Sequence, residues 1–365
     1  MSARRLLMTT DAVGRVWHYS TELARALVAH GYETVLALTG PAPDAAQRAA
    51  ALAIPGMQLI DAGTGLDWLA PDTAAIADAG RQIAALASEL RADVVQLNAP
   101  SLAAGVRWPV PVVAVTHSCT ATWWQAAAGG ALPADFAWRA AVMADGLRAA
   151  AAVVAPSAAF ADATQRAYQL GRRPAVVHNG RTAPTLPPAT MQDYAFTAGR
   201  LWDRGKDAAT LDRAAGLTTV PVIAAGPICG PNGATARFDH ATAIGVLGEA
   251  ALEARLAARP VFVSAARYEP FGLAVLEAAA AGCALVLADI ATFRELWDGA
   301  AQFVTPADAS GFAAAIEAIV ADTPHRLALG QAAAERAARY TPDAMAAGMV
   351  AVYTAVADRS ARQAA

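Results

Sequence analysis

Two glutamates with a Pro-Phe-Gly turn between them, Glu269 and Glu277, form the most specific chemical pattern in this chain. Val261–Ser264 is a short β-branched and aromatic run, which predicts a buried strand. A loop follows over 267–272, because proline removes a backbone donor and glycine permits unusual dihedral angles. Strong helix formers begin at Leu273. The pattern predicts strand, tight loop and helix N-terminus, with one carboxylate in the loop and one a turn into the helix.

This arrangement suits a phosphorylated, hydroxyl-rich ligand. The backbone N–H groups of Phe271, Gly272 and Leu273, with the positive end of the helix dipole, would attract a diphosphate. A carboxylate only accepts hydrogen bonds, so Glu269 and Glu277 suit sugar hydroxyls. Either glutamate alone is better explained as a solvated charge. The two together, around Pro-Phe-Gly, indicate a sugar-nucleotide site.

A second signal is Lys206, because every other basic residue of the chain is arginine. A sequence that uses lysine once suggests a need for a compact ammonium group there. Lys206 and Arg200 lie in a glycine-containing loop after the predicted strand Ala195–Ala198. The two cations would face the helix N-terminus if this domain is Rossmann-like, whereas the alternative is a solvated loop without function.

The elements that position these residues alternate between strand and helix in both halves of the chain. The first half opens with a strand at Arg5–Thr10, a helix from about Tyr19 to His30 and a strand at Thr34–Leu38, which is typical of a doubly wound parallel sheet. Gly14 lies in the first loop, where phosphates usually bind. The alternative is that this glycine only allows the backbone to turn. His18, near the end of that loop, is a candidate contact for an acceptor substrate.

Strand ends in such sheets line the ligand crevice, so Asn98 and His117 are further candidates. The alternative for His117 is to satisfy local backbone groups, and without other information this alternative is favoured. Trp123 and Trp124 stand before two glycines, which suggests a mobile lip whose aromatic faces stack on an acceptor sugar. Packing of that loop onto the domain is an equally good explanation.

Composition excludes several classes of protein. A chain of 365 residues with 56% hydrophobic and 16% charged residues fits two folded domains. No apolar run is long enough to span a bilayer, and polar residues interrupt the start of the chain too early for a signal peptide, so we expect a cytoplasmic protein. The three cysteines are scattered singly, which argues against a zinc site or a disulfide framework. A net charge of −3 gives no footprint for nucleic acid.

The segment Glu-Pro-Phe-Gly-Leu-Ala-Val-Leu-Glu at 269–277 resembles the E-x7-E signature of the retaining family 4 glycosyltransferases (glycosyltransferase group 1). The resemblance continues through 278–289 and 293–296. It implies the α/β fold called GT-B, in which two Rossmann-like, doubly wound parallel-sheet domains face a central cleft. In this family the first glutamate contacts the donor sugar and the second holds the ribose of the nucleotide.

The resemblance also implies roles for residues outside the signature. It places Gly14 near the donor phosphates, makes His117 face the donor sugar, and assigns Arg200 and Lys206 to the donor diphosphate. His117, Arg200, Lys206 and Glu269 are thus the predicted catalytic residues. The family lysine usually comes one residue earlier than Lys206, so Arg204 is a possible substitute.

The predicted domain organisation follows from composition and from the family. An acceptor-binding domain covers 1–183, and a Pro-rich segment without periodicity, 184–193, is the linker. A donor-binding domain covers 194–342. By analogy with the family, a last helix over 343–365 packs back onto the first domain.

The predicted function is a retaining glycosyltransferase of polysaccharide biosynthesis, which moves a sugar from a nucleoside-diphosphate-sugar to a hydroxyl acceptor that is a glycan, a lipid or a small metabolite. No D-x-D pair occurs, so we expect no metal ion and no cofactor beyond the donor substrate. Peripheral membrane association stays open. The alternatives are a catalytically silent sugar-nucleotide-binding subunit, a sugar-nucleotide 2-epimerase of the same fold and, least favoured, a dinucleotide-dependent oxidoreductase.

Overall fold

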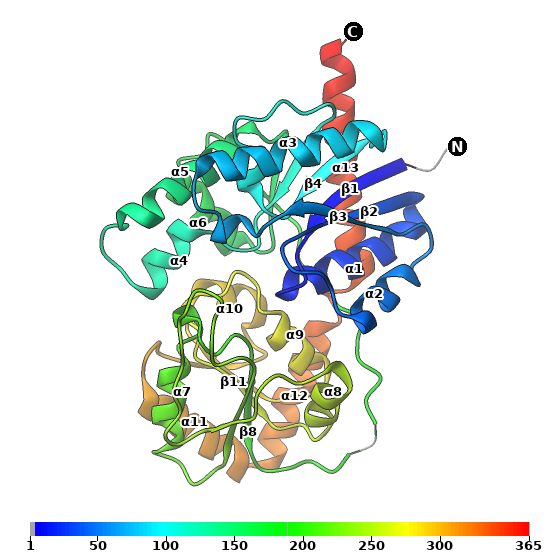
Figure 1. Ribbon diagram of the computed structural model, residues 1–365. Coiled ribbons are helices and arrows are strands. Elements are labelled where there is room, and N and C mark those ends of the chain that lie inside the picture. Colours follow the sequence, from blue (N-terminus) through cyan, green and yellow to red (C-terminus); the bar gives the residue numbers. More distant parts are fainter. Residues whose placement is uncertain (1–3, 188, 365) are drawn as a thin grey trace. The chain divides into compact units, whose positions relative to one another are not determined.

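The computed structural model of the protein describes residues 4–187 and 189–364 (Figure 1). These residues form two compact units, and each unit has its own parallel sheet. The first unit draws on 1–124, 130–180 and 342–365, and the second on 125–129 and 181–341. The segment predicted as a linker, 184–193, contains no helix or strand in its described residues.

The first unit contains, within the described residues, a seven-stranded parallel sheet in the order β3-β2-β1-β4-β5-β6-β7. Its strands are β1 (Arg4–Thr10), β2 (Tyr32–Thr39), β3 (Gln58–Thr64), β4 (Val94–Leu97), β5 (Val112–Val115), β6 (Ala152–Ala155) and β7 (Ala175–Val176). Its helices are α1 (Arg15–Leu27), α2 (Ala45–Leu52), α3 (Thr73–Glu89), α4 (Thr120–Ala127), α5 (Ala134–Ala149), α6 (Ala158–Tyr168) and α13 (Pro342–Ala364), with 3₁₀ turns η1 (Val28–His30), η2 (Asp67–Leu69) and η3 (Pro100–Ala103). The last three residues of α4 count with the second unit.

Helices cover both faces of this first sheet, as a parallel sheet requires. Along β1 the side chains alternate: Leu6 and Met8 enter one apolar cluster, and Leu7 enters the cluster on the other face. The Leu7 cluster includes Ile83 of α3. The Leu6 cluster includes Met349 of α13, which packs against α1 (Figure 1).

The second unit contains, in its described part, a six-stranded parallel sheet in the order β10-β9-β8-β11-β12-β13. Its strands are β8 (Ala195–Ala198), β9 (Val222–Ala225), β10 (Thr242–Ala243), β11 (Val261–Ser264), β12 (Leu285–Ala288) and β13 (Gln302–Val304). Its helices are α7 (Ala208–Ala215), α8 (Glu249–Ala257), α9 (Leu273–Ala280), α10 (Ala291–Trp297), α11 (Ala309–Ala321) and α12 (Thr323–Ala337), with the 3₁₀ turn η4 (Arg204–Lys206).

The strand that leads to the glutamate loop lies in the middle of this second sheet. β11 pairs with β8 on one side and β12 on the other. Phe262 packs into one apolar cluster and Val263 into the cluster on the opposite face. Because β11 has a strand on each side and an apolar cluster on each face, the start of the loop that follows it is held firmly in place.

The predicted α/β fold with two doubly wound parallel sheets is confirmed. Within the segment 119–133, Thr120–Ala127 forms helix α4, since those eight residues contain no glycine or proline to interrupt it. One local prediction is wrong. The helix expected from about Tyr19 begins at Arg15, so His18 lies within α1 and not in a loop.

Candidate active site

Two loops of the second unit bring Lys206 beside Glu269. Lys206 ends η4, in the loop after β8, and Glu269 lies in the loop after the neighbouring strand β11. The carbonyl oxygen of Gly205 accepts a hydrogen bond from the N–H of Arg267 (2.9 Å), which joins the two loops. Lys206 Nζ then donates to Glu269 Oε2, and the side chains are only 24% and 15% exposed. Residues that are 63 positions apart in the chain therefore form one cation–carboxylate pair.

Arg200 lies in the same β8–η4 loop but makes a separate interaction. Its guanidinium donates to Asp203 Oδ2 (3.2 Å) and lies 5.8 Å from the ring centre of Trp202. Half of the Arg200 side chain is exposed. Among the described residues, no hydrogen bond or ion pair joins Arg200 to Lys206 or Glu269, so the structure does not bring the two predicted diphosphate cations into contact.

The N-terminus of α9 has backbone amides that no side chain caps. Gly272 has φ of +94° and no side-chain cap, and Leu276 is the first residue whose N–H reaches an in-helix acceptor, the Gly272 carbonyl (3.0 Å). The amides of the preceding turn, including Leu273, are the donors that a helix leaves for a ligand. Phe271 anchors the turn, because its ring is buried and packs edge-to-face on Tyr340 (5.6 Å between centroids).

Glu277 is buried one turn into α9, and an arginine neutralises it. Arg181 Nε donates to Glu277 Oε1 (3.2 Å), and the other arm of the same guanidinium reaches Glu249 Oε1 (2.9 Å). Only 8% of the Glu277 side chain is exposed, compared with 70% for Glu249. Arg181 therefore orients the carboxylate predicted to hold the ribose.

In the first unit, Asn98 and His117 follow the neighbouring strands β4 and β5. Asn98 Oδ1 lies 3.1 Å from His117 Nε2, and the ring of Tyr19 meets the imidazole edge-on at 4.4 Å between centroids. Desolvation by burial lowers the pKa of His117 to about 4, so the imidazole is neutral at neutral pH. The recorded partner of His117 is thus a side-chain amide, not the backbone groups considered as the alternative.

Gly14 and His18 differ from their predicted settings. Gly14 is the N-cap of α1 with φ of −135°, a conformation open to any residue. Its N–H lies 3.2 Å from Asp11 Oδ1, which also accepts from Val13 N–H (3.0 Å). The amide of Gly14, a residue predicted to lie near the donor phosphates, therefore donates to a carboxylate in this structure. His18 is half-buried on α1.

Trp123 and Trp124 belong to an aromatic cluster. Phe136 of α5 stacks on Trp123 with 6.3 Å between centroids and tilts against Trp124 at 5.0 Å. Both tryptophans are half-buried, so part of each ring is exposed. Packing accounts for their position, and contact with an acceptor stays a prediction.

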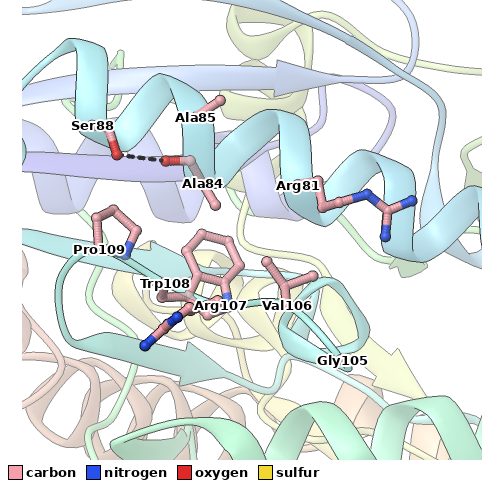
Figure 2. Close-up of a pocket in the computed structure, with 9 residues that line it drawn as sticks. All are labelled: Arg81, Ala84, Ala85, Ser88, Gly105, Val106, Arg107, Trp108 and Pro109. Carbon is pink, nitrogen blue, oxygen red and sulfur yellow. Dashed lines mark hydrogen bonds between the residues drawn. The ribbon is translucent and has the colours of Figure 1, made fainter.

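A separate hollow lies elsewhere in the first unit, between the C-terminal half of α3 and the loop before β5. Figure 2 shows Trp108 in this hollow, with Arg81 and Arg107 among the residues that line it. It lies at the amino end of β5, whereas His117 follows the carboxyl end. None of the predicted site residues lines it.

The described residues contain neither a metal-binding cluster nor a helix that could span a membrane. No group of three or more His, Cys, Asp or Glu side chains in 4–187 and 189–364 could hold a metal ion. Over the same ranges, no helix combines the length and the apolar character needed to cross a membrane.

Comparison with known families decides the class of the protein. The family model for "Glycosyltransferase Family 4" matches residues 16–182, and the model for "Glycosyl transferases group 1" matches 238–336, so together they cover well over half of the chain. The chain belongs to the family 4, group 1 glycosyltransferases. None of the curated proteins matches this glycosyltransferase in sequence.

Solved structures share the GT-B fold of this glycosyltransferase. Sucrose-phosphate synthase from Thermosynechococcus elongatus superposes with a TM-score of 0.77 at 19% identity, over 99% of this chain and 100% of that one. Anabaena HepE in complex with UDP-glucose has a TM-score of 0.72 at 17% identity, over 96% of this chain and 99% of that one. WaaG, a glycosyltransferase involved in lipopolysaccharide biosynthesis, has a TM-score of 0.72 at 13% identity, over 96% and 99%.

Two residues of this glycosyltransferase site gave little or no signal in the sequence. Arg181 stands at the start of a Pro-rich stretch, where composition predicts only an irregular segment, and no spacing connects it with Glu277. Asn98 could be found from its place at a strand end, but its pairing with His117 depends on which strands are neighbours.

Proposed function

We propose that this glycosyltransferase moves a sugar from a nucleoside-diphosphate-sugar to a hydroxyl acceptor, with retention of the anomeric configuration and without a metal ion. One observation carries the proposal: the Lys206–Glu269 pair stands directly before the uncapped N-terminus of α9, and Glu277 follows one turn later. A carboxylate, the first amides of a helix and a second carboxylate thus succeed one another along one loop and helix, and the neighbouring loop adds a cation beside the first carboxylate. This order suits a ligand made of sugar, diphosphate and ribose.

In this proposal, donor binding exchanges the partners of the ion pair. The diphosphate binds the α9 amides and draws Lys206 towards itself, with Arg200 as a second, more exposed cation. Glu269 is then available to accept hydrogen bonds from hydroxyls of the donor sugar. Glu277, held by Arg181, accepts hydrogen bonds from the ribose hydroxyls.

The chemical step breaks the bond between the anomeric carbon and the diphosphate oxygen and forms a bond to the acceptor oxygen on the same face of the sugar. The acceptor proton passes to the departing phosphate oxygen, so no side chain has to act as the base. Lys206, Arg200 and the α9 amides stabilise the negative charge that grows on the diphosphate. His117 in the first unit contacts the donor sugar, and His18, Trp123 and Trp124 are the proposed acceptor contacts.

UDP-glucose is the first donor to test, because HepE was solved with it. The experiment is a thermal-shift screen of UDP-, GDP-, ADP- and TDP-sugars with and without EDTA, followed by assay of hydrolysis or transfer. We expect one nucleotide class to raise the melting temperature in EDTA, and Glu277→Ala to abolish that rise. A rise that needs a divalent metal would contradict metal independence. A rise without any turnover would favour a silent subunit, and isomerised donor without acceptor would favour an epimerase.

A further inference from the structure

A series of hydrogen-bonded polar side chains runs through the first unit and ends at His117. Tyr353 of α13 donates its hydroxyl hydrogen to Gln96 Oε1, and Gln96 Nε2 donates to Asn98 Oδ1 (2.9 Å). Asn98 Oδ1 also lies 3.1 Å from His117 Nε2. Gln96 and Tyr353 are almost fully buried, so packing holds this end of the hydrogen-bonded series in place.

The backbone fixes which way the Asn98 amide points. Asn98 Nδ2 lies 2.7 Å from the carbonyl oxygen of Thr9, on β1, and 3.1 Å from Ser20 Oγ. A backbone carbonyl can only accept a hydrogen bond, so the nitrogen of the amide must face Thr9. Rotating the amide by half a turn would set its oxygen against the Thr9 carbonyl and its nitrogen against Gln96 Nε2, which also donates. Oδ1 therefore faces His117.

The orientation of Asn98 in turn decides where the proton of His117 sits. An amide oxygen cannot donate, so the hydrogen bond forms only if His117 Nε2 carries the hydrogen. In the neutral imidazole the other nitrogen, Nδ1, then keeps its lone pair. Among the described residues, Nδ1 has no recorded hydrogen-bond partner, and the His117 side chain is only half-buried.

We propose that Asn98 is a positioning residue that holds His117 as the neutral Nε2–H tautomer, so that Nδ1 presents an acceptor to a hydroxyl of the donor sugar. The second half of this inference rests on the proposed role of His117, whereas the first half concerns the protein alone. The depressed pKa of His117 agrees with it, because a weakly basic imidazole stays neutral and accepts a hydrogen bond without taking a proton. His117 then accepts a hydrogen bond from the sugar and does not act as a general base.

The first test needs no substrate, and it uses a variant only to assign the signal. Long-range ¹H–¹⁵N correlation spectra of the full-length protein, labelled with ¹⁵N-histidine, report the tautomer of each imidazole at pH 7. His117→Gln identifies the signal of His117. We expect a protonated Nε2 and an unprotonated Nδ1. A protonated Nδ1, or an imidazolium, overturns the inference whatever the enzyme turns over.

The second test asks whether the position of the proton matters for donor use. Asn98→Ala should give a mixture of tautomers and lower kcat/KM for the donor about tenfold, the effect of one ordinary hydrogen bond. In a His117→Gln background, Asn98→Ala should have no further effect. Ser20→Ala is the matched control, because it removes another partner of Asn98 and leaves the Thr9 contact; it should keep the tautomer and the activity.

The two tests separate this inference from the proposed function. If no donor is turned over but the Nε2–H tautomer is found, the positioning by Asn98 stands and the proposed function fails. If Asn98→Ala lowers kcat/KM equally with and without His117, Asn98 acts in some other way and the link to the donor sugar is wrong.

Discussion

Each carboxylate predicted to hold a sugar hydroxyl has a cationic partner in this structure. Glu269 pairs with Lys206, and Glu277 pairs with Arg181. A buried carboxylate needs such a partner, because an isolated charge away from water is costly. The same contact fixes the direction of the oxygen atoms that would meet the ligand.

Arg181→Met should weaken the binding of the nucleotide that raises the melting temperature in the screen about tenfold or more, because Glu277 loses the guanidinium that orients it. Glu249→Ala is the control: it removes the exposed contact of the same arginine and should leave the affinity unchanged. Isothermal titration of that nucleotide into each variant checks this. Equal loss in both variants would mean that Arg181 acts as a general surface charge.

Lys206→Met should lower kcat by about 10² or more, which is typical for the loss of one group that stabilises the charge of a leaving group. Lys206→Arg should recover part of this loss, because the charge returns with a different shape. Steady-state kinetics of these variants beside Arg204→Met decides between the two cations. A large loss in Arg204→Met with Lys206→Met unimpaired would assign the diphosphate to Arg204.

The pKa of His117 predicts how stability changes with pH. Its folded value of about 4 lies below the ordinary value of 6.5, so the unfolded chain binds the proton more readily between these limits. The contribution of neutral His117 to the free energy of unfolding is complete above pH 6.5. It is lost as the pH falls towards 4, at no more than about 1.4 kcal/mol per pH unit. Urea unfolding from pH 7 to 4 measures it, and His117→Gln should reduce the slope. An unchanged slope would contradict the lowered pKa.

At the scale of one element, α9 begins and ends at glycines with positive φ, Gly272 (+94°) and Gly282 (+74°). A β-carbon on Gly272 would meet Phe293, Glu269 and Val275 side chains at 3.2–3.4 Å, whereas a β-carbon on Gly282 has nothing closer than 3.9 Å. Gly272 therefore lets the chain turn sharply beside Glu269 and enter α9.

Gly272→Ala should destabilise the protein by about 1–3 kcal/mol, from backbone strain and from the close neighbours. Gly282→Ala carries similar strain without the crowding and should cost less. Denaturant midpoints of the two variants provide the comparison. Equal costs would show that the packing around Gly272 adapts freely, which would remove the steric reason for a glycine there.

At the scale of the whole molecule, the last helix completes the core of the first unit. Met345, Met349, Tyr353 and Val356 of α13 are each at most 2% exposed. Burial of four such side chains contributes roughly 6–12 kcal/mol, which is comparable to the entire stability of a domain. Along the sequence, the polypeptide therefore re-enters the first unit after the residues of the second unit.

A protein truncated after Thr341 should have a first unit that does not fold, whereas a protein truncated after Arg359 should fold completely. Near-UV circular dichroism and limited proteolysis distinguish the two. The longer product is the control, because it retains all four buried side chains. A shorter product with cooperative unfolding of both units would show that α13 is dispensable.

The local sequence was sufficient for the fold class, for the strand–loop–helix around Glu269 and for the family. Alternation of strands and helices, a Pro-Phe-Gly turn and the spacing of two glutamates are properties of neighbouring residues. Helix α4 was not predicted, because the paired tryptophans and the two glycines of this segment drew attention to a loop and not to the helix formers between them. The setting of Gly14 was missed because it depends on the direction of the Asp11 side chain.

Only the tertiary structure decided how the charged and polar groups pair. Lys206 with Glu269, Arg181 with Glu277 and Asn98 with His117 are separated by 63, 96 and 19 positions in the chain. Their contacts depend on which strands are neighbours in a sheet and on where each loop leaves its strand. Local propensities do not determine these distances, because packing of the cores on both faces of each sheet sets them.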